Sequence, residues 1–490
     1  MQLLNKRLYF LFLLPVFFVL HGFMVNYGSV KLRDALLLML LYCSVALVLV
    51  GLSWLYYRNM VKAALLAIFL LAFNFFFGSL QDLFKNRLHV TSIFRYRIIL
   101  PVCLLVLIFI VIWLKRSGRT FSSLVQYLNL ALILFILIDL GSLILKISGG
   151  KKKSNDLTAT KFTKCDTCNK PDVFLIISDQ YTGNTALKKV FDFDNSSFEN
   201  ELRLRGFHIA GNSSSNYNLT PFSIASTLNM DYLDLKRGPQ TSNGVSYSYE
   251  LIRNSRVLNF FSLQGYQFYN CSIFDFDDQP AHKYGSLLPY GTKLITSQTF
   301  TSRIWKDIRL DILKGKFGFK SFRKKIAYEH LNYNKDVMAL TAYNAALKSS
   351  KPKFVYTHLM MPHYPYYFDS KGNPLPVEKL GGIANVNTHD FIEYLQYSNK
   401  RLLELVDEIL KRSATPPVIL LLGDHGFRNS EKKTDGKYDF VNLNATYFPN
   451  RNYSGIYDSI SNVNQFRIVF NTFFNQRLPL LKDSTVNVWD

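Results

Sequence analysis

Three short motifs with acidic or imidazole side chains each follow a run of apolar residues. Asp179 follows VFLIIS, His358 follows FVYT, and the pair Asp424-His425 follows VILLLG; His363 lies five residues beyond His358. Carboxylates and neutral imidazoles are suitable ligands for zinc or manganese, and neither ion requires cysteine. These residue types therefore predict a metal site, provided that the fold brings the motifs together.

The apolar runs before these motifs have the composition of strands that are buried on both faces of a sheet. In a parallel sheet the carboxyl ends of the strands lie at one edge, where the chemistry collects. A single Asp at such a position is often only the cap of the next helix, because Asp is strongly favoured there. Three such positions in one chain favour a shared site over three unrelated caps.

A fourth motif, NLTPFSIASTL, places Thr220 before a proline and a helix-compatible run. Proline is favoured at the first helical position, so Thr220 is predicted to be the N-cap of a helix. One interpretation is a capping threonine and nothing more. The other is functional, because a helix N-terminus would stabilise both the alkoxide of Thr220 and a bound phosphate or sulfate ester. Metal coordination is an established way to activate such a hydroxyl.

Short apolar runs alternate with amphipathic stretches from residue 171 onward. Strands are predicted at 173–177, 266–269, 354–359 and 418–422, and helices at 198–205, 249–264 and 395–411. This alternation predicts an α/β domain over residues 171–490, with a large, mostly parallel sheet that helices cover on both faces.

The first 148 residues have a different composition. Five charge-poor segments are long enough, or nearly so, to cross a bilayer, which takes about 20 apolar residues. They run over 8–25, 35–57, 63–80, 98–114 and 121–145. A cleaved signal peptide fits the first segment poorly, because it lacks a small-residue cleavage site. We therefore predict an all-α transmembrane domain of about five helices over residues 1–148.

The positive charge of the chain is shared between its two parts. Residues 1–150 and 151–490 each carry a formal charge of +11. Basic residues beside a membrane favour anionic lipid headgroups, and no nucleic-acid-binding module is visible, so nucleic acid is not an expected partner. The Lys and Arg residues outside the spans do not decide the orientation of the helices. Five spans nevertheless place the two ends of the transmembrane domain on opposite sides of the membrane.

Residues 149–170 are polar and are predicted to form a juxtamembrane linker. They contain Cys165 and Cys168, which either form a local disulfide in an oxidising compartment or remain two thiols. Further along, the run Arg303–Lys325 contains nine Lys or Arg and two Asp. That run is either a solvated helix face or a surface that docks on anionic headgroups.

The order of these motifs resembles the alkaline phosphatase/sulfatase superfamily. The matching features are Asp179 at the first strand end, Thr220 at a helix start, His358 and His363 before Pro365, and the motif Gly-Asp424-His425-Gly. The resemblance covers residues 171–490. With its N-terminal spans the chain is most similar to the membrane-bound branch, which includes phosphoethanolamine transferases, phosphoglycerol transferases and lipoteichoic acid synthases. Those proteins carry an extracytoplasmic catalytic domain after their transmembrane helices.

The resemblance implies a role for each matching residue. Asp179, Asp424 and His425 match the metal ligands, and Thr220 matches the nucleophile, which also contacts the metal. His363 matches a histidine near the transferred group, where it would bind non-bridging oxygens or protonate the leaving alkoxide.

His358 leaves two interpretations open. It matches a second histidine near the transferred group, and it would then bind substrate. A buried structural histidine is an equal alternative at this position.

Three departures from the family narrow the expected chemistry. Sulfatases convert Cys or Ser to formylglycine, which Thr220 cannot become, and their motif carries an Arg that is missing here. Asp179 is followed by Gln180 rather than by a second acid, and no histidine follows His425, although two-zinc members need one downstream. One divalent metal ion, zinc or manganese, is therefore expected.

We expect a membrane-anchored metalloenzyme that transfers a phospho-substituent of the phosphoethanolamine or phosphoglycerol type. The donor would be a membrane phospholipid, the acceptor an extracytoplasmic glycan or lipid, and the intermediate a phospho-threonine. One alternative is a phosphodiester or sulfuric ester hydrolase of the same fold, and another is a non-catalytic membrane binding protein. The resemblance further implies a bacterial inner membrane with the catalytic domain in the periplasm. The sequence leaves the oligomeric state open.

Overall fold

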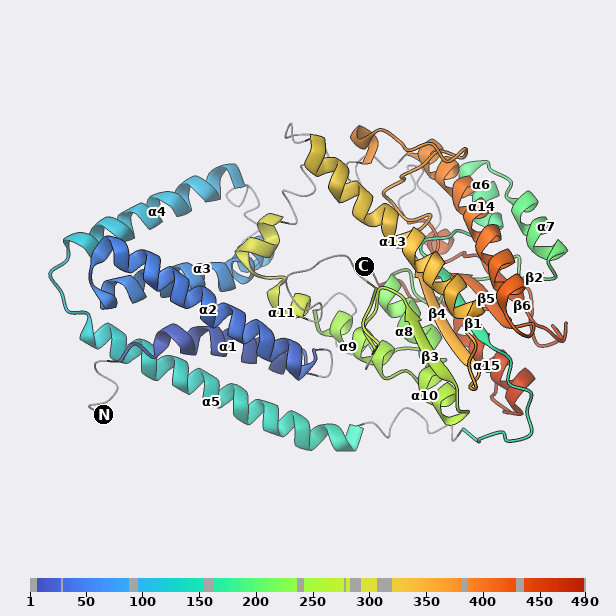
Figure 1. The fold of residues 1–490 in the computed structure, drawn as a ribbon, viewed down its shortest axis with the longest axis horizontal. Coiled ribbons are helices and arrows are strands. Elements are labelled where there is room, and N and C mark those ends of the chain that lie inside the picture. Colours follow the sequence, from blue (N-terminus) through green and yellow to red (C-terminus); the bar gives the residue numbers. More distant parts are fainter. Residues whose placement is uncertain are drawn as a thin grey trace. The chain divides into compact units, whose positions relative to one another are not determined.

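The computed structural model describes the chain apart from residues 1–6, 28–29, 88–95, 154–161, 236–241, 277–278, 283–291, 306–319, 381–386, 429–435 and 489–490. The chain forms two compact units (Figure 1). The helical unit comprises Met1–Ala159 and Ser286–Ile308, and the sheet unit comprises Thr160–Gly285 and Arg309–Asp490. The predicted division into residues 1–148, 149–170 and 171–490 stays a prediction, and it does not anticipate that residues 286–308 group with the helices.

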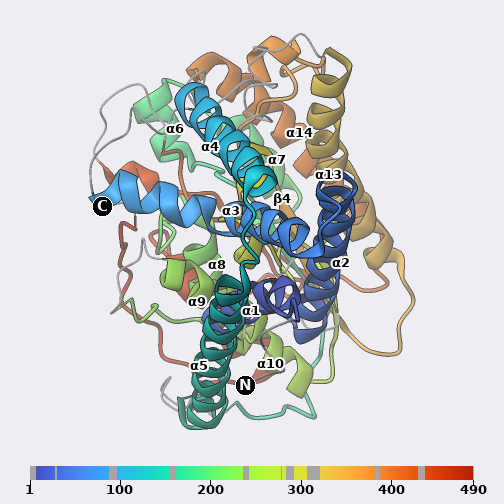
Figure 2. The same ribbon diagram turned by 90° about the vertical axis from the view of Figure 1, so that its left-hand side faces the viewer.

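Five apolar helices make up most of the helical unit. They are α1 (Phe10–Val25), α2 (Leu32–Tyr57), α3 (Met60–Arg87), α4 (Tyr96–Arg116) and α5 (Ser122–Lys153). Each coincides with one of the predicted spans. α1 contacts α2, α3 and α5 (Figure 2). The four helices α2 to α5 are long and apolar enough to cross a membrane, whereas α1, with 16 residues, is shorter.

The outward surface of these helices is apolar. Phe109 and Leu145, for example, expose 67% and 74% of their surface. In water such side chains would be costly, because burial of each one is worth about 1.5–3 kcal/mol. A soluble protein rarely exposes a large contiguous apolar surface. The helical unit therefore has the surface of an integral membrane protein, as predicted.

The sheet unit is built on a six-stranded sheet with the order β2-β6-β5-β1-β4-β3. The strands are β1 (Val173–Ser178), β2 (His208–Ile209), β3 (Gln267–Cys271), β4 (Lys353–Leu359), β5 (Val418–Gly423) and β6 (Asn444–Tyr447). β1, β3, β4 and β5 run parallel to one another, and β6 is antiparallel to β5. The predicted mostly parallel sheet is confirmed, and the four predicted strands are all in it.

Helices cover both faces of the sheet, as predicted. Phe174 and Ile176 of β1 pack in one core with α6 (Asn184–Phe191), α7 (Ser196–Leu204), α13 (Lys320–Ala346) and α14 (Thr388–Arg412). Val173, Leu175 and Ile177 pack in the other core with α8 (Thr220–Asn229), α10 (Arg256–Leu263) and α15 (Asn462–Phe474). Successive side chains of a strand point to opposite faces, so a strand that is covered on both sides must be apolar throughout.

The stretch 249–264 forms two helices instead of the single predicted one. α9 (Ser242–Arg253) ends before Ser255, and the hydroxyl of Ser255 accepts a hydrogen bond from the N–H of Leu258 at 3.3 Å. Ser255 thus caps α10 and interrupts an apolar pattern that is continuous in the sequence. The predicted helix at 198–205 overlaps α7, and the one at 395–411 lies within α14. Short helical turns are α11 (Lys293–Thr296), η3 (Val377–Leu380) and η5 (Gly436–Asp439).

Cys165 and Cys168 form a disulfide, with their Cα atoms 5.6 Å apart. The backbone N–H of Cys165 donates to Oε1 of Gln264 at 2.9 Å. The amide of Gln264 in turn donates to the carbonyl oxygen of Thr163 at 2.9 Å. The disulfide end of the linker is therefore fixed to the sheet unit, and of the two alternatives for these cysteines the structure shows the disulfide.

Candidate metal centre

Two neighbouring parallel strands, β1 and β5, bring the first two acids together. Ser178 of β1 is the register partner of Gly423 of β5. The next residues, Asp179 and Asp424, therefore lie side by side at the carboxyl edge of the sheet. They are only 2% and 0% exposed. Burial of two carboxylates side by side is costly unless a cation or hydrogen-bond donors compensate for their charge.

Each carboxylate has one satisfied oxygen. Oδ1 of Asp424 accepts hydrogen bonds from the backbone N–H groups of Gln180 and His425, at 2.8 and 2.9 Å. Oδ2 of Asp179 lies 3.4 Å from Nε2 of His358. The other two oxygens, Oδ2 of Asp424 and Oδ1 of Asp179, are buried and have no hydrogen-bond partner among the described residues. Because buried polar atoms are nearly always satisfied, two such oxygens fit a site for a cation.

The imidazole of His425 turns one nitrogen toward the same point. Nδ1 lies 2.8 Å from the carbonyl oxygen of Gly426, and it must carry the hydrogen because a carbonyl only accepts. Burial lowers the pKa of His425 and favours the neutral ring, in which Nε2 has a lone pair. Nε2 lies 3.4 Å from Oδ2 of Asp424 and 3.9 Å from Oδ1 of Asp179.

Thr220 adds an oxygen from the start of α8. Its Oγ1 lies 3.3 Å from Nε2 of His425. The prediction that Thr220 is the N-cap is wrong: Leu219 has that position, and its carbonyl accepts from the N–H groups of Phe222 and Ser223. Pro221 takes an early helical position, as expected. The hydroxyl of Thr220 is thus directed to His425 rather than used as a cap.

These four side chains have the spacing of a metal site. The ligand atoms of Asp179, Asp424 and His425 lie within 4.8 Å of one another. Metal–ligand bonds of about 2.0–2.2 Å in a tetrahedral arrangement separate neighbouring ligand atoms by roughly 3.3–3.6 Å. The distances from Nε2 of His425, which run from 3.3 to 3.9 Å, are close to that range. The group could therefore hold a divalent metal ion.

His358 lies behind Asp179 and is fully buried. Its Nδ1 is 3.1 Å from the hydroxyl of Tyr356. When that hydroxyl donates to Nδ1, Nε2 carries the ring hydrogen and can donate to the carboxylate of Asp179. Histidine and carboxylate partners of this kind orient metal ligands. His358 is therefore a buried neighbour of Asp179, and its role in substrate binding stays a prediction.

His363 lies on the loop after β4 and is partly exposed. Its Nδ1 donates to the carbonyl oxygen of Tyr364 at 2.6 Å, so Nε2 is the nitrogen that can exchange a proton. Burial raises the pKa of Asp179, but its interactions with His363, His358 and His425 lower it by more, and the net shift is downward. The charge of His363 therefore acts on the carboxylate of Asp179.

Arg428 also lies at this site, although the sequence did not predict it. Its Nη1 donates to the carbonyl oxygen of Asn218 at 2.9 Å, two residues before Thr220. Burial lowers the pKa of Arg428, while the carboxylates of Asp424 and Asp179 act to raise it. The guanidinium thus lies near both acids and the loop that carries Thr220. A lone Arg shortly after an Asp-His motif at a strand end was the signal that could have identified it.

Distant residues hold the loop before Thr220 in place. The carbonyl of Asn216 accepts from the N–H of Val486 at 2.9 Å, and Oδ1 of Asn218 accepts from the N–H of Val488 at 3.0 Å. Both asparagines are buried. The loop that leads to Thr220 therefore has a fixed backbone, and this fixes the position from which the Thr220 side chain projects.

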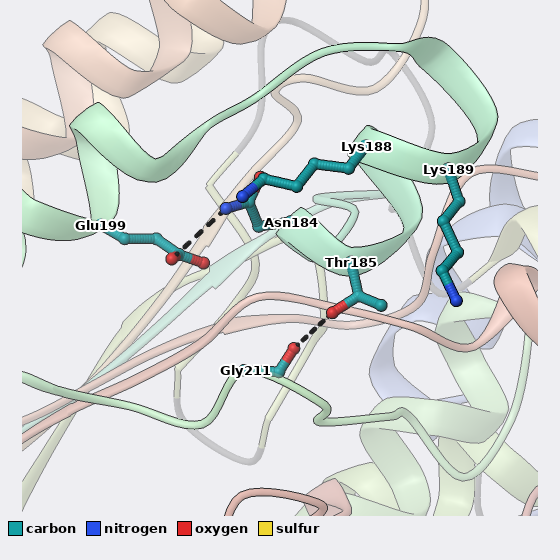
Figure 3. A pocket seen from close by; sticks show the side chains of 6 residues that line it. All are labelled: Asn184, Thr185, Lys188, Lys189, Glu199 and Gly211. Carbon is teal, nitrogen blue, oxygen red and sulfur yellow. Dashed lines mark hydrogen bonds between the residues drawn. The ribbon is translucent and has the colours of Figure 1, made fainter.

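An open pocket of about 220 Å³ lies beside the start of α6 (Figure 3). It is lined by Asn184, Thr185, Lys188, Lys189, Glu199 and Gly211. The hydroxyl of Thr185 donates to the carbonyl of Gly211 at 2.9 Å, which joins the start of α6 to the end of β2. Lys188 and Lys189 give this pocket positive charge, and both are exposed. None of the residues of the metal centre lines it.

No protein-family model and no curated protein matches the sequence. Among solved structures, full-length lipooligosaccharide phosphoethanolamine transferase A (EptA) from Neisseria meningitidis is 12% identical, with 94% of this chain and 95% of that chain covered and a TM-score of 0.36. The periplasmic domain of EptC from Escherichia coli is 12% identical over 67% of this chain and 92% of that chain, with a TM-score of 0.41. A phosphonate monoester hydrolase from Agrobacterium radiobacter is 11% identical over 62% and 73%, with a TM-score of 0.39.

Proposed function

We propose that this protein is a membrane-anchored, metal-dependent phosphotransferase with Thr220 as its nucleophile. The observation that supports it most is the convergence of Oγ1 of Thr220 with the ligand atoms of Asp179, Asp424 and His425. The three ligand residues are buried, whereas Thr220 is partly exposed. A substrate can therefore reach the hydroxyl while the ligands stay shielded from water.

Asp179, Asp424 and His425 would hold one divalent ion, zinc or manganese, because both accept carboxylate and imidazole ligands. A bound ion would supply a lowered pKa for the Thr220 hydroxyl and polarisation of a phosphoryl oxygen. His358 would keep Asp179 oriented through Oδ2, which leaves Oδ1 to face the site.

In the first half-reaction, Oγ1 of Thr220 attacks the phosphorus of the donor, and the bond between phosphorus and the lipid alcohol breaks. A phospho-threonine forms, and the alcohol leaves with the proton that the hydroxyl has lost. His363 would carry this proton, because its Nδ1 is bonded to a carbonyl and Nε2 can accept and return it. Arg428 would bind the non-bridging oxygens through its planar guanidinium.

In the second half-reaction, a hydroxyl of the acceptor attacks the same phosphorus, the bond to Oγ1 breaks, and Thr220 regains its proton. We propose a membrane phospholipid with a phosphoethanolamine or phosphoglycerol headgroup as the donor, and a glycan or lipid as the acceptor. The apolar helices support this choice, because they anchor the chain in the phase that contains the donor. With water as the acceptor, the same steps would make the protein a hydrolase.

The disulfide supports an extracytoplasmic, periplasmic position for the sheet unit. Disulfides form and persist in oxidising compartments and are rare in the cytosol. The Cys165–Cys168 bond lies where the chain enters the sheet unit. The acceptor would then be a molecule of the bacterial cell envelope.

The test is an intact-mass measurement on the purified full-length protein after incubation with zinc or manganese and with phosphatidylethanolamine or phosphatidylglycerol. We expect a headgroup adduct on Thr220, release of diacylglycerol, and loss of the adduct when an acceptor is added. Thr220→Ser should still form the adduct and Thr220→Ala should not. The matched control is Thr388→Ala, because Thr388 is also the first residue of a helix. An adduct that persists in Thr220→Ala, or no adduct with either lipid on metal-loaded protein, would refute the proposal.

A further inference from the structure

A segment that lies between β3 and α13 in the sequence belongs to the helical unit. Its described part runs from Thr292 to Trp305 and includes α11. We call residues 292–305 the docked segment. The chain passes between the two units after Ala159, before Ser286 and after Ile308. The linker is therefore only one of three connections between them.

Hydrogen bonds join the docked segment to α3. The backbone N–H of Gly78 donates to the carbonyl oxygen of Gln298 at 2.8 Å. The backbone N–H of Thr301 donates to Oδ1 of Asn74 at 3.1 Å. Both bonds use a backbone group of the docked segment, so they fix the position of the segment along the helix.

One ion pair lies beside these bonds. The guanidinium of Arg303 contacts Oδ2 of Asp82 and Oε1 of Gln298, each at 2.6 Å. Arg303 begins the basic run Arg303–Lys325, and residues 306–319 of that run lie outside the described residues. Within the described part, this charge is used for a contact with α3.

Apolar side chains fill the rest of the contact. The ring of Phe300 lies with its centroid 4.9 Å from that of Phe73 and 4.8 Å from that of Phe77. Ile295 is buried in the core of the helical unit. The docked segment is thus packed into the bundle as an interior element would be.

Two glycines make room for the segment. A Cβ atom on Gly78 would lie 2.4 Å from the carbonyl oxygen of Gln298, which is backbone and cannot turn away. A Cβ atom on Gly22 of α1 would lie 2.6 Å from Cγ2 of Ile295. By contrast, a Cβ atom on Gly141 of α5 would meet nothing within 4 Å. Gly78 and Gly141 therefore form a matched pair for substitution.

The contacts cluster at one end of the bundle. Gly22 lies near the last residue of α1, and Gly78 lies in the C-terminal part of α3. α5 reaches the same end, because Nζ of Lys146 donates to the carbonyl of Met24 at 2.7 Å. The segment therefore docks at the end of the bundle where the chain leaves α5 for the sheet unit.

We infer that the docked segment is a second, noncovalent anchor that holds the sheet unit to the membrane helices independently of the linker. Its partner surface is the glycine-containing contact formed by α1 and α3 of the same chain. The linker alone would leave the sheet unit on a single polar tether, whereas the anchor limits its movement. The inference concerns attachment, so it holds whether or not Thr220 is a nucleophile.

The first test cuts the linker in the full-length protein. A specific protease site is placed between residues 154 and 161, the protein carries an N-terminal tag, and cleavage is done in a nonionic detergent without anionic lipid. We expect the C-terminal fragment to co-purify with the tagged helices. Gly78→Leu should reduce the co-purified fraction by about tenfold or more, because the overpacked contact must open. Gly141→Leu should leave it unchanged.

The second test does not depend on a destabilising variant. Disulfides need Cβ atoms about 3.5–4.5 Å apart, and a Cβ on Gly22 would lie 3.1 Å from Cβ of Ile295. In a background with Cys43→Ser and Cys103→Ser, the pair Gly22→Cys and Ile295→Cys should cross-link the two fragments after linker cleavage. The pair Gly141→Cys and Ile295→Cys should not. Release of the wild-type fragment, equal retention in Gly78→Leu and Gly141→Leu, or equal cross-linking of both pairs would overturn the inference.

Discussion

The metal centre and the docked segment both join parts of the chain that are far apart in sequence, but they use charge in opposite ways. In the metal centre, Asp179 and Asp424 are almost completely buried, and one oxygen of each has no partner among the residues that the structure describes. In the docked segment, the side chains of Asp82 and Arg303 are 36% and 26% exposed and pair with each other. A buried charged group without a partner is typical of a ligand site, whereas a partly exposed, paired charge is typical of a structural contact.

The largest effect should come from Thr220, the proposed nucleophile beside the candidate metal centre. Thr220→Ala should reduce headgroup transfer by about a thousandfold or more, because it removes the hydroxyl that would form the intermediate. The rate is measured as release of diacylglycerol from phospholipid in detergent. Thr388→Ala should keep the wild-type rate, and a Thr220→Ala enzyme that is nearly as active as wild type would remove the proposed nucleophile.

The next largest effect tests whether the buried charge of Asp424 is available for a ligand or is already paired. Asp424→Asn keeps an acceptor at Oδ1 and removes the buried negative charge. In the presence of a chelator it should raise the free energy of unfolding by about 1–3 kcal/mol. Zinc at a hundred times its dissociation constant should stabilise the wild type by about 2.7 kcal/mol and the variant much less. Both are measured by thermal unfolding. A variant that is less stable than wild type without metal would mean that the carboxylate is satisfied.

Arg428 tests whether the metal centre also binds the phosphoryl group. Arg428→Lys keeps the positive charge near Asp179 and Asp424 but loses the planar pair of donors. We expect kcat/KM to fall by about 10–100-fold with little change in metal affinity. Steady-state kinetics and metal titration check the two quantities. Arg412→Lys, on the exposed side of α14, is the control, and an equal effect of both variants would exclude a role in substrate binding.

The smallest effect should come from the ion pair of the docked segment. Arg303→Ala should lower the free energy of unfolding by less than about 1 kcal/mol, because a partly exposed ion pair contributes little. Chemical or thermal unfolding of the full-length protein in detergent measures it. An effect as large as that of Asp424→Asn would show that the two regions do not differ in the way described above.

Much of the fold could be predicted because local patterns of apolar residues determine it. The runs before Asp179 and Asp424 are apolar at every position, which is typical of strands covered on both faces, and parallel strands bring their ends to one edge. The break at Ser255 could not be predicted with the same ease, because a single capping hydroxyl decides it within a continuous apolar pattern. The docked segment was missed for another reason: its contact between Gly78 and Gln298 joins distant positions that share no periodicity.

The candidate site shows the same division. Asp179, Thr220, Asp424 and His425 could be named from the sequence because each lies beside a recognisable strand or helix start. The convergence of their ligand atoms could not be predicted, since the tautomer of His425 and the direction of the Thr220 hydroxyl depend on side-chain geometry. Arg428 lies in a loop without a periodic pattern, and its hydrogen-bond partner is 210 residues away.

The hydrogen bonds from Val486 and Val488 to the loop before Thr220 set an order of events during biosynthesis. Asn216 also donates to the carbonyl of Ser484, which is made 268 residues later. The loop cannot take its final shape until those residues have been synthesised. A nascent chain that carries the proposed metal ligands but lacks residues 484–488 would therefore not yet hold Thr220 in the loop shape that the structure shows.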